Sequence, residues 1–119
     1  MVDMLIVPQF IKKHFDLLND QLIAPHLLIS EVLNVLKRHE LSKSLSRSDT
    51  NSLAAAFAQA PIDFIPSETL RNDIWAMSQN LSPYDAMYVS VAKLTQTALL
   101  TRDKRMAKAA QKYCEVLML

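Results

Sequence analysis

The stretch "LSPYDAMYVSVAKLTQTALLTRDKRMAKAA", residues 81–110, carries the pattern that decides the fold of this chain. A turn signal, Ser82-Pro83, leads into an apolar run headed by Asp85, and this predicts a helix that extends to about Gln96. A short apolar strand at 98–100 and a helix at 101–113 are predicted to follow. Helix, strand and helix in such close succession are typical of an α/β protein.

The rest of the chain repeats this alternation of strands and helices. Apolar runs predict strands at 3–7, 21–25, 62–66 and 114–119, and helical spacing predicts helices at 8–20, 26–40, 51–60 and 68–80. Ser67 is predicted to cap the helix at 68–80. The alternation predicts a three-layer α/β/α fold with a small central parallel sheet. Because there is no linker or repeat, residues 1–119 are expected to form a single domain.

Composition excludes several classes of protein. The chain has 13 Lys plus Arg and 12 Asp plus Glu, so its bulk charge favours neither a nucleic acid nor a membrane. It contains no glycine, which excludes glycine-rich phosphate-binding loops. One cysteine, the absence of a secretory pattern and the absence of a membrane-length apolar run lead us to expect a cytoplasmic protein outside the membrane.

Three carboxylates stand at unusual places in this pattern. Glu31 interrupts an apolar helix, Asp85 opens another, and Asp103 directly follows a strand. Ligands bind at the carboxyl ends of parallel strands, where three such acids would converge. Clustered carboxylates repel one another unless a hard cation such as Mg²⁺ or Mn²⁺ neutralises them. The chemistry that fits is metal-assisted hydrolysis of a phosphodiester.

Asp85 and Asp103 each have a structural alternative. Ser82 and Asp85 match a capping box, and Asp103 or Thr101 is a candidate N-cap for the last helix. The two interpretations are compatible, because a capping aspartate can present its second oxygen to a ligand.

Glu31 also has an alternative. It shares a helix stripe with Asn34 and Arg38, which is the pattern of a solvent-exposed face. On that interpretation its carboxylate would serve only the surface of the helix.

Several motifs in this order resemble one family. They are "LIAPHLLISEVLNVLKR", "LSPYDAMYVSVAKLTQTALLTRDKRMAKAA" and the final "CEVLML", and they resemble the PIN-domain family, in particular its short VapC-type toxin ribonucleases. The resemblance implies a Mg²⁺- or Mn²⁺-dependent endoribonuclease that acts on structured RNA such as tRNA, forms a homodimer and is silenced by a cognate antitoxin. By motif, it places metal-binding and catalytic acids at Glu31, Asp85 and Asp103. It also implies that the Thr101 hydroxyl supports the site.

The chain departs from the family pattern at its first acid. The candidate is Asp3, but only Met1 and Val2 precede it, where the family has a full strand. Two hypotheses therefore stand. In the first, the chain is a metal-dependent endoribonuclease in which Glu31, Asp85 and Asp103 hold the ion, with Asp3 as a further candidate acid. In the second, the chain is a non-catalytic PIN-like interaction module that has lost its first metal-binding acid.

Six cations gather in the segment 93–112, beside a single acid. Of these, Arg102, Lys104 and Arg105 adjoin Asp103 and are predicted to bind RNA phosphates. The alternative for each of them is an ordinary solvated helix face.

The aromatic residues carry a weaker signal. Trp75, Tyr84 and Tyr88 are interpreted as core or interface residues rather than as platforms for stacked bases. Glycine-free turns offer no open loop to receive a splayed base.

Overall fold

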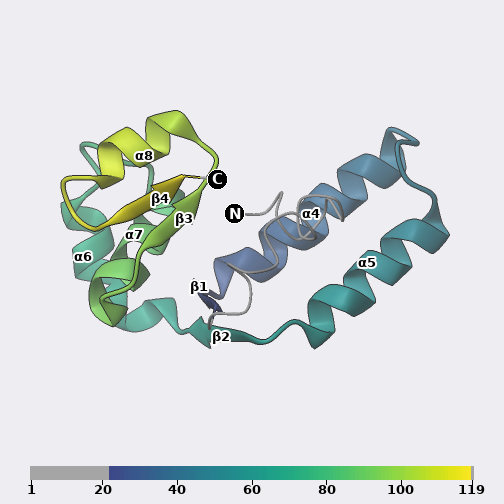
Figure 1. Ribbon diagram of the computed structural model, residues 1–119, viewed down its shortest axis with the longest axis horizontal. Helices are drawn as coiled ribbons and strands as arrows, with labels where there is room; N and C mark the ends of the chain where they lie inside the picture. The colour runs from purple at the N-terminus through teal and green to yellow at the C-terminus, as the bar shows by residue number, and fades with distance from the viewer. Residues whose placement is uncertain (1–21, 119) are drawn as a thin grey trace. The chain divides into compact units, whose positions relative to one another are not determined.

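The computed structural model describes residues 22–118 (Figure 1). The chain divides into two compact units. One, the α7 unit, contains Ile23–Leu27 and 64–118, and the other, the α4–α5 unit, contains Leu22 and Leu28–Asp63. The predicted strand at 3–7, the predicted helix at 8–20 and the candidate acid Asp3 lie outside the described residues.

The described elements alternate largely as the sequence predicts. In chain order they are β1 (Leu22–Pro25), α4 (Leu27–Leu41), α5 (Arg47–Gln59), β2 (Ile62–Ile65), the 3₁₀ helix η1 (Ser67–Leu70), α6 (Arg71–Ala76), α7 (Pro83–Thr95), β3 (Leu99–Thr101), α8 (Lys104–Ala110) and β4 (Val116–Met118). This order confirms the predicted α/β class. No helix within 22–118 is both long and apolar enough to cross a bilayer.

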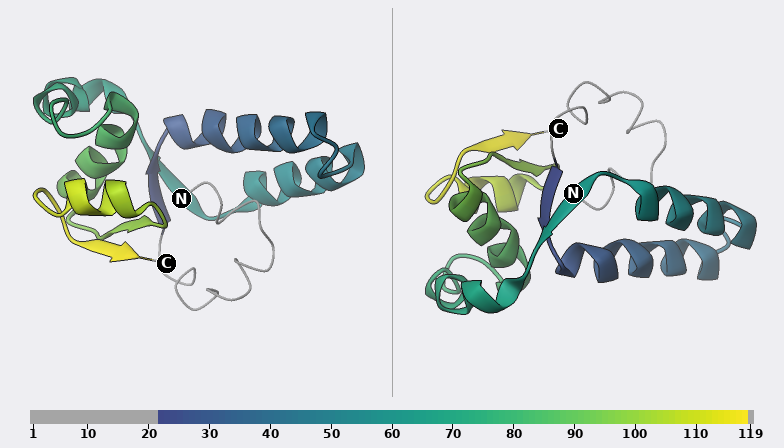
Figure 2. Two further views of the ribbon diagram at one scale, coloured as in Figure 1. Left: turned by 90° about the horizontal axis from the view of Figure 1, so that it is seen from above. Right: turned by 90° about the horizontal axis from the view of Figure 1, so that it is seen from below.

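The described strands form two pairs, β1 with β2 and β3 with β4. The strands β3 and β4 are parallel (Figure 2). In their register, Leu99 lies opposite Val116 and Thr101 lies opposite Met118. This parallel pair agrees with the predicted strands at 98–100 and 114–119 and with the predicted parallel sheet. Both α7 and α8 pack against β3.

The α4–α5 unit is a pair of helices that lie side by side (Figure 1). On α4, the buried residues Leu28, Val32 and Leu36 recur every four positions, and this places them on one stripe. The helix α5 begins four residues earlier than predicted, because Ser46 caps it. The Ser46 hydroxyl accepts from the Asp49 N–H at 3.0 Å and the Asp49 carboxylate accepts from the Ser46 N–H at 3.2 Å, which forms a full capping box.

A polar cluster links these two helices. Glu40 of α4 accepts hydrogen bonds from Arg47 at 3.1 Å and from Thr50 at 3.0 Å, both on α5. The hydrogen bond from Arg47, and then that from Thr50, lower the pKa of Glu40.

Helix α7 is the central element of the α7 unit. Ser82 caps it with an oxygen that accepts from the Asp85 N–H at 3.1 Å, and Pro83 occupies the first turn. The helix ends at Gln96, which adopts the left-handed conformation with φ 54°. Its buried residues lie almost all round the helix: Ala86, Tyr88, Val89, Ser90, Val91 and Ala92. The predicted helix from Pro83 to about Gln96 is confirmed.

The single helix predicted at 68–80 with a Ser67 cap is wrong. Ser67 is instead the first residue of η1, and the residue before it makes no capping hydrogen bond with its side chain. The hydrogen-bonding pattern changes from that of a 3₁₀ helix to that of an α-helix at Leu70, whose φ of −106° and ψ of 3° are not helical. The predicted shared face is nevertheless confirmed, because Leu70, Ile74 and Met77 are all buried.

An acid on α6 holds α7 by two polar contacts. Asp73 accepts from the buried Ser90 hydroxyl at 2.7 Å and from the Lys93 ammonium at 2.8 Å. The hydrogen bond from Lys93 is the main cause of the lowered pKa of Asp73, and that from Ser90 adds to it against the opposing effect of burial. Lys93 also lies 5.8 Å from the centre of the Tyr113 ring, and Tyr113 in turn accepts a hydrogen bond from Asn80 at 2.8 Å.

Replacing Asp73 by alanine is expected to lower the free energy of unfolding by about 1–3 kcal/mol, because it leaves the Ser90 hydroxyl buried without an acceptor. The pKa of Asp73 is lower in the folded chain than its ordinary value of 3.8. Its stabilisation is therefore present above that pH and is lost as the pH falls through the folded value. Urea unfolding at neutral and at acidic pH measures both effects.

The matched control is Asp73→Asn, which keeps an oxygen acceptor for Ser90 and removes only the charge that faces Lys93. We expect its free energy of unfolding to lie between those of the wild type and Asp73→Ala. Equal stability of the alanine variant and the wild type would show that the contact contributes nothing.

Candidate active site

Two of the predicted acids, Asp85 and Asp103, act on each other electrostatically within the α7 unit. Asp85 lies in the first turn of α7. Asp103 follows β3 after one residue and is the N-cap of α8. We call these two residues the acidic pair. Because one acid comes from a helix start and the other from a strand end, the fold, not the local sequence, joins them.

Asp103 is held in place by hydrogen bonds with the backbone of α8. Its Oδ1 accepts from the Arg105 N–H at 2.9 Å and from the Met106 N–H at 3.1 Å. These bonds confirm the capping role and leave Oδ2 without a hydrogen-bond donor among the described residues. A capping aspartate here therefore keeps one oxygen for a ligand.

Thr101 supports this arrangement from inside the core. It is 2% exposed, and its Oγ1 accepts from the Asp103 N–H at 3.0 Å while it faces the Met106 sulfur at 3.9 Å. Thr101 belongs to β3, so the alternative that it caps the last helix is wrong. Its hydroxyl instead holds the backbone of Asp103, which is the residue that caps the helix.

The two charges of the acidic pair disfavour each other. Burial is the main cause of the raised pKa of Asp85, and the negative charge of Asp103 raises it further, whereas a hydrogen bond with Ser82 lowers it. Desolvation and a like charge both penalise the ionised form, and a nearby divalent cation would reverse that penalty. Carboxylate oxygens are the ligands that Mg²⁺ and Mn²⁺ prefer, so the donor set fits such an ion.

Glu31 belongs to the other unit. It is half-buried on the second turn of α4, where the side chains of Asn34 and Arg38 on the same stripe are exposed. Over its described residues, neither unit alone gathers three or more His, Cys, Asp or Glu side chains that could hold a metal. The convergence of Glu31 with the acidic pair stays a prediction.

The cations beside Asp103 are exposed. Arg102, Lys104 and Arg105 all project from the end of β3 or the start of α8. Lys93, earlier in the same basic segment, is bound to Asp73. The predicted use of these three side chains for RNA phosphates is compatible with their exposure and remains a prediction.

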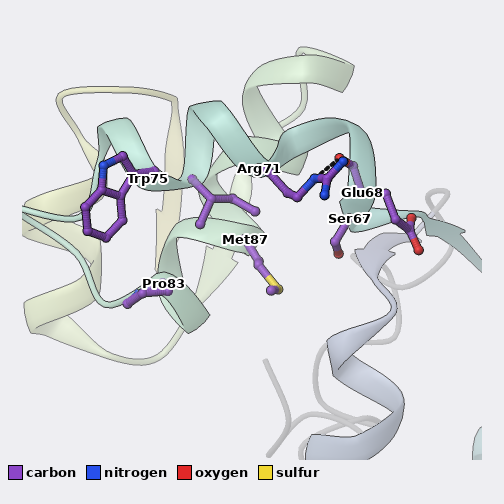
Figure 3. Close-up of a pocket in the computed structure, with 7 residues that line it drawn as sticks. Ser67, Glu68, Arg71, Trp75, Pro83 and Met87 are labelled. Carbon is purple, nitrogen blue, oxygen red and sulfur yellow. Dashed lines mark hydrogen bonds between the residues drawn. The ribbon is translucent and has the colours of Figure 1, made fainter.

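An apolar groove, which the sequence did not predict, opens between α6 and α7 (Figure 3). It has a volume of about 360 Å³. The lining residues come from η1, α6 and α7: Ser67, Glu68, Arg71, Ile74, Trp75, Pro83 and Met87. Of the two predicted positions, core or interface, the core is excluded for Trp75, which is 75% exposed, and for Tyr84, which is 64% exposed. Tyr88 is buried.

The groove and the acidic pair use different faces of α7. Pro83 and Met87 lie four residues apart, and therefore on one side of the helix. Asp85 lies two residues from each of them, which is roughly 200° round the helix. An occupant of the groove would therefore not need to contact Asp85.

A small α/β chain with a buried threonine behind a pair of interacting aspartates defines the class of protein. A family model described as the PIN domain matches residues 8–112, and the chain belongs to this family. The match includes Glu31 and the acidic pair but begins after Asp3.

Curated relatives are similar over most of the chain. "VapC ribonuclease Mb0985" of Mycobacterium bovis is 33% identical over 97 residues, which cover 82% of this chain and 76% of the relative. "Ribonuclease VapC1" of Mycobacterium tuberculosis is 35% identical over 94 residues, which cover 78% and 71% of the two chains. "Ribonuclease VapC3" of the same organism is 29% identical over 86 residues.

Proposed function

We propose that this chain is a divalent-metal-dependent endoribonuclease of the VapC type, the toxin component of a toxin–antitoxin pair, which hydrolyses phosphodiester bonds in RNA. The observation that carries the proposal is the acidic pair, in which burial and then the charge of Asp103 raise the pKa of Asp85. Membership of the PIN domain family and the ribonuclease names of the relatives support it.

In the proposed site, Asp85 and Asp103 hold Mg²⁺ or Mn²⁺ and Glu31 is a further ligand. An ion held there would supply Lewis-acid chemistry: it would polarise the scissile phosphate and lower the pKa of a water molecule that attacks it. The chain itself orients the ligands: the α8 cap fixes Asp103, and Thr101 holds its backbone. The cations beside Asp103 bind the phosphates of the substrate.

The assembly around this site is also proposed. Residues 1–119 form a single PIN-like domain, so that Glu31 and the acidic pair serve one centre. The protein is a cytoplasmic homodimer that a cognate antitoxin silences, and a structured RNA such as tRNA is its substrate. The motifs that resemble the VapC-type toxins support each of these proposals.

A cleavage assay tests the proposed activity. The purified full chain is incubated with labelled tRNA in buffer alone, with Mg²⁺, with Mn²⁺, and with each ion plus a chelator. We expect discrete fragments only where a free divalent ion is present. Cleavage that survives an excess of chelator would contradict metal dependence, and intact RNA under every condition would contradict the nuclease.

Replacing Glu31 by glutamine tests the third ligand. Because the change removes a charge and keeps the size of the side chain, we expect cleavage to require a Mn²⁺ concentration about 10–100-fold higher. Full-length Lys37→Gln, also on α4, is the control for effects on that helix. An unchanged Mn²⁺ requirement would place Glu31 outside the metal centre.

The second candidate function is a non-catalytic interaction module. The specific observation in its favour is the apolar groove with its exposed Trp75, which lies away from the acidic pair. Exposed apolar grooves mark sites of protein association. Cleavage and Mn²⁺ binding by the wild type separate the two candidates, and loss of that cleavage in Asp3→Asn would make Asp3 part of the centre. A wild type that neither binds Mn²⁺ nor cleaves RNA favours the module.

A further inference from the structure

Helix α8 separates its apolar and basic residues on opposite sides. Met106, Ala107 and Ala110 are buried, whereas Lys104 and Lys108 are exposed. At about 3.6 residues per turn, the two lysines stack one turn apart and point away from the buried side.

The helical path continues beyond the last residue of α8, to Lys112. Gln111 has helical dihedral angles, φ −57° and ψ −24°, and the Cys114 N–H donates to the Ala110 carbonyl at 3.1 Å. Lys112, which is exposed, therefore extends the spacing of Lys104 and Lys108 by one more turn. We call Lys104, Lys108 and Lys112 the lysine row.

No acid neutralises this row within residues 22–118. The only acids in the segment 93–118 are Asp103 and Glu115, and neither forms an ion pair with the row in the described part of the chain. Lys93, by contrast, forms an ion pair, because its ammonium lies 2.8 Å from the Asp73 carboxylate. Three adjacent cations that have no counterion among the described residues repel one another and attract a polyanion.

The row begins at the acidic pair. Lys104 directly follows Asp103, and the row extends from there over eight residues, or about 12 Å of helix. The Cβ atoms of successive lysines are separated by about 6 Å. This spacing is comparable to the distance between neighbouring phosphates of one nucleic-acid strand. A compact ammonium on a flexible stem suits sequence-independent phosphate binding.

We propose that the lysine row binds consecutive phosphates of one RNA strand and leads that strand away from the acidic pair. The proposal rests on the proposed ribonuclease function and adds Lys108 and Lys112 to its substrate site. It also predicts that affinity depends on RNA length, since a fragment that fills only the acidic pair does not reach the far end of the row.

The test is a binding measurement on full-length Asp85→Asn, without divalent ions, so that no cleavage is needed. Lys108→Gln and Lys112→Gln are added together, and fluorescence anisotropy gives Kd for a single-stranded RNA of about 12 nucleotides at several salt concentrations. Because this variant lacks two of the cations that bind phosphates, we expect the slope of log K against log salt to fall by about 1.4. We expect Kd at low salt to rise about tenfold, and a fragment of about three nucleotides to be unaffected.

The matched control is Lys37→Gln with Lys43→Gln in the same background, which changes the net charge equally on the α4–α5 unit. The row is supported if only the α8 variant loses affinity and salt slope. It is overturned if both variants lose them equally, if neither does, or if the long RNA does not bind. RNA binding through the row without any cleavage by the wild type would overturn the nuclease and leave the row intact.

The substitutions at Lys108 and Lys112 are compatible with folding, because glutamine is a good helix former and both replaced side chains are exposed. Equal melting temperatures of the two double variants confirm that the comparison is between folded chains.

Discussion

Asp85→Asn is expected to lower the rate of metal-dependent RNA cleavage by about a thousandfold while the fold is retained. Asparagine has the shape of aspartate but carries no charge, so the acidic pair loses half of the negative charge that attracts the cation. The Ser82 cap of α7 is unaffected, because it uses the backbone N–H of residue 85. Single-turnover cleavage of labelled tRNA at saturating Mn²⁺ measures the change.

The stability of the same variant provides the control. Burial and Asp103 raise the pKa of Asp85 above its ordinary value of 3.8, so the folded chain disfavours the ionised form. This cost is absent at low pH and grows as the pH rises through 3.8 and then through the folded value. Without metal, Asp85→Asn should therefore be at least as stable as the wild type near neutral pH, and the difference should vanish on acidification. Cleavage by Asp85→Asn at the wild-type rate would contradict a role of Asp85 in the reaction.

The second large effect is expected at Asp103, where two roles can be separated. Asparagine is as good an N-cap as aspartate, whereas alanine is not. Asp103→Asn should therefore lose cleavage by about a thousandfold at unchanged stability. Asp103→Ala should lose the same activity and also about 1 kcal/mol of stability, because Arg105 and Met106 lose their acceptor.

Thermal unfolding of both variants, together with cleavage at saturating Mn²⁺, makes the comparison. Retained cleavage in Asp103→Asn would mean that Asp103 serves only as a helix cap. Equal stability of the two variants would mean that the observed cap contributes nothing.

Local signals in the sequence predicted most of the α7 unit. Ser82-Pro83 predicted the start of α7, and Asp103 was one of two candidate caps for the last helix, because capping depends only on residues close in the chain. The same signals failed at Ser67, where the expected cap became the first residue of η1. Leu70, at the junction of η1 and α6, is buried, and such burial depends on tertiary packing that a local capping signal does not encode.

The acidic pair was predicted because both acids flank strongly patterned elements. The groove was not predicted, because an exposed Trp75 and a buried tryptophan have the same spacing in a sequence. The bonds from Asp73 to Ser90 and Lys93 span 17 and 20 residues, and their pairing depends on how α6 meets α7. Sequence periodicity identifies helix faces but does not identify the contacts between helices.

The most direct test of the acidic pair is calorimetric titration of Mn²⁺ into the full chain and into the full-length double variant Asp85→Asn with Asp103→Asn. A saturable site in the wild type that disappears in the folded double variant is the predicted result. A wild type with no saturable site, or a double variant that binds Mn²⁺ as tightly as the wild type, would contradict the claim that these two aspartates hold the cation.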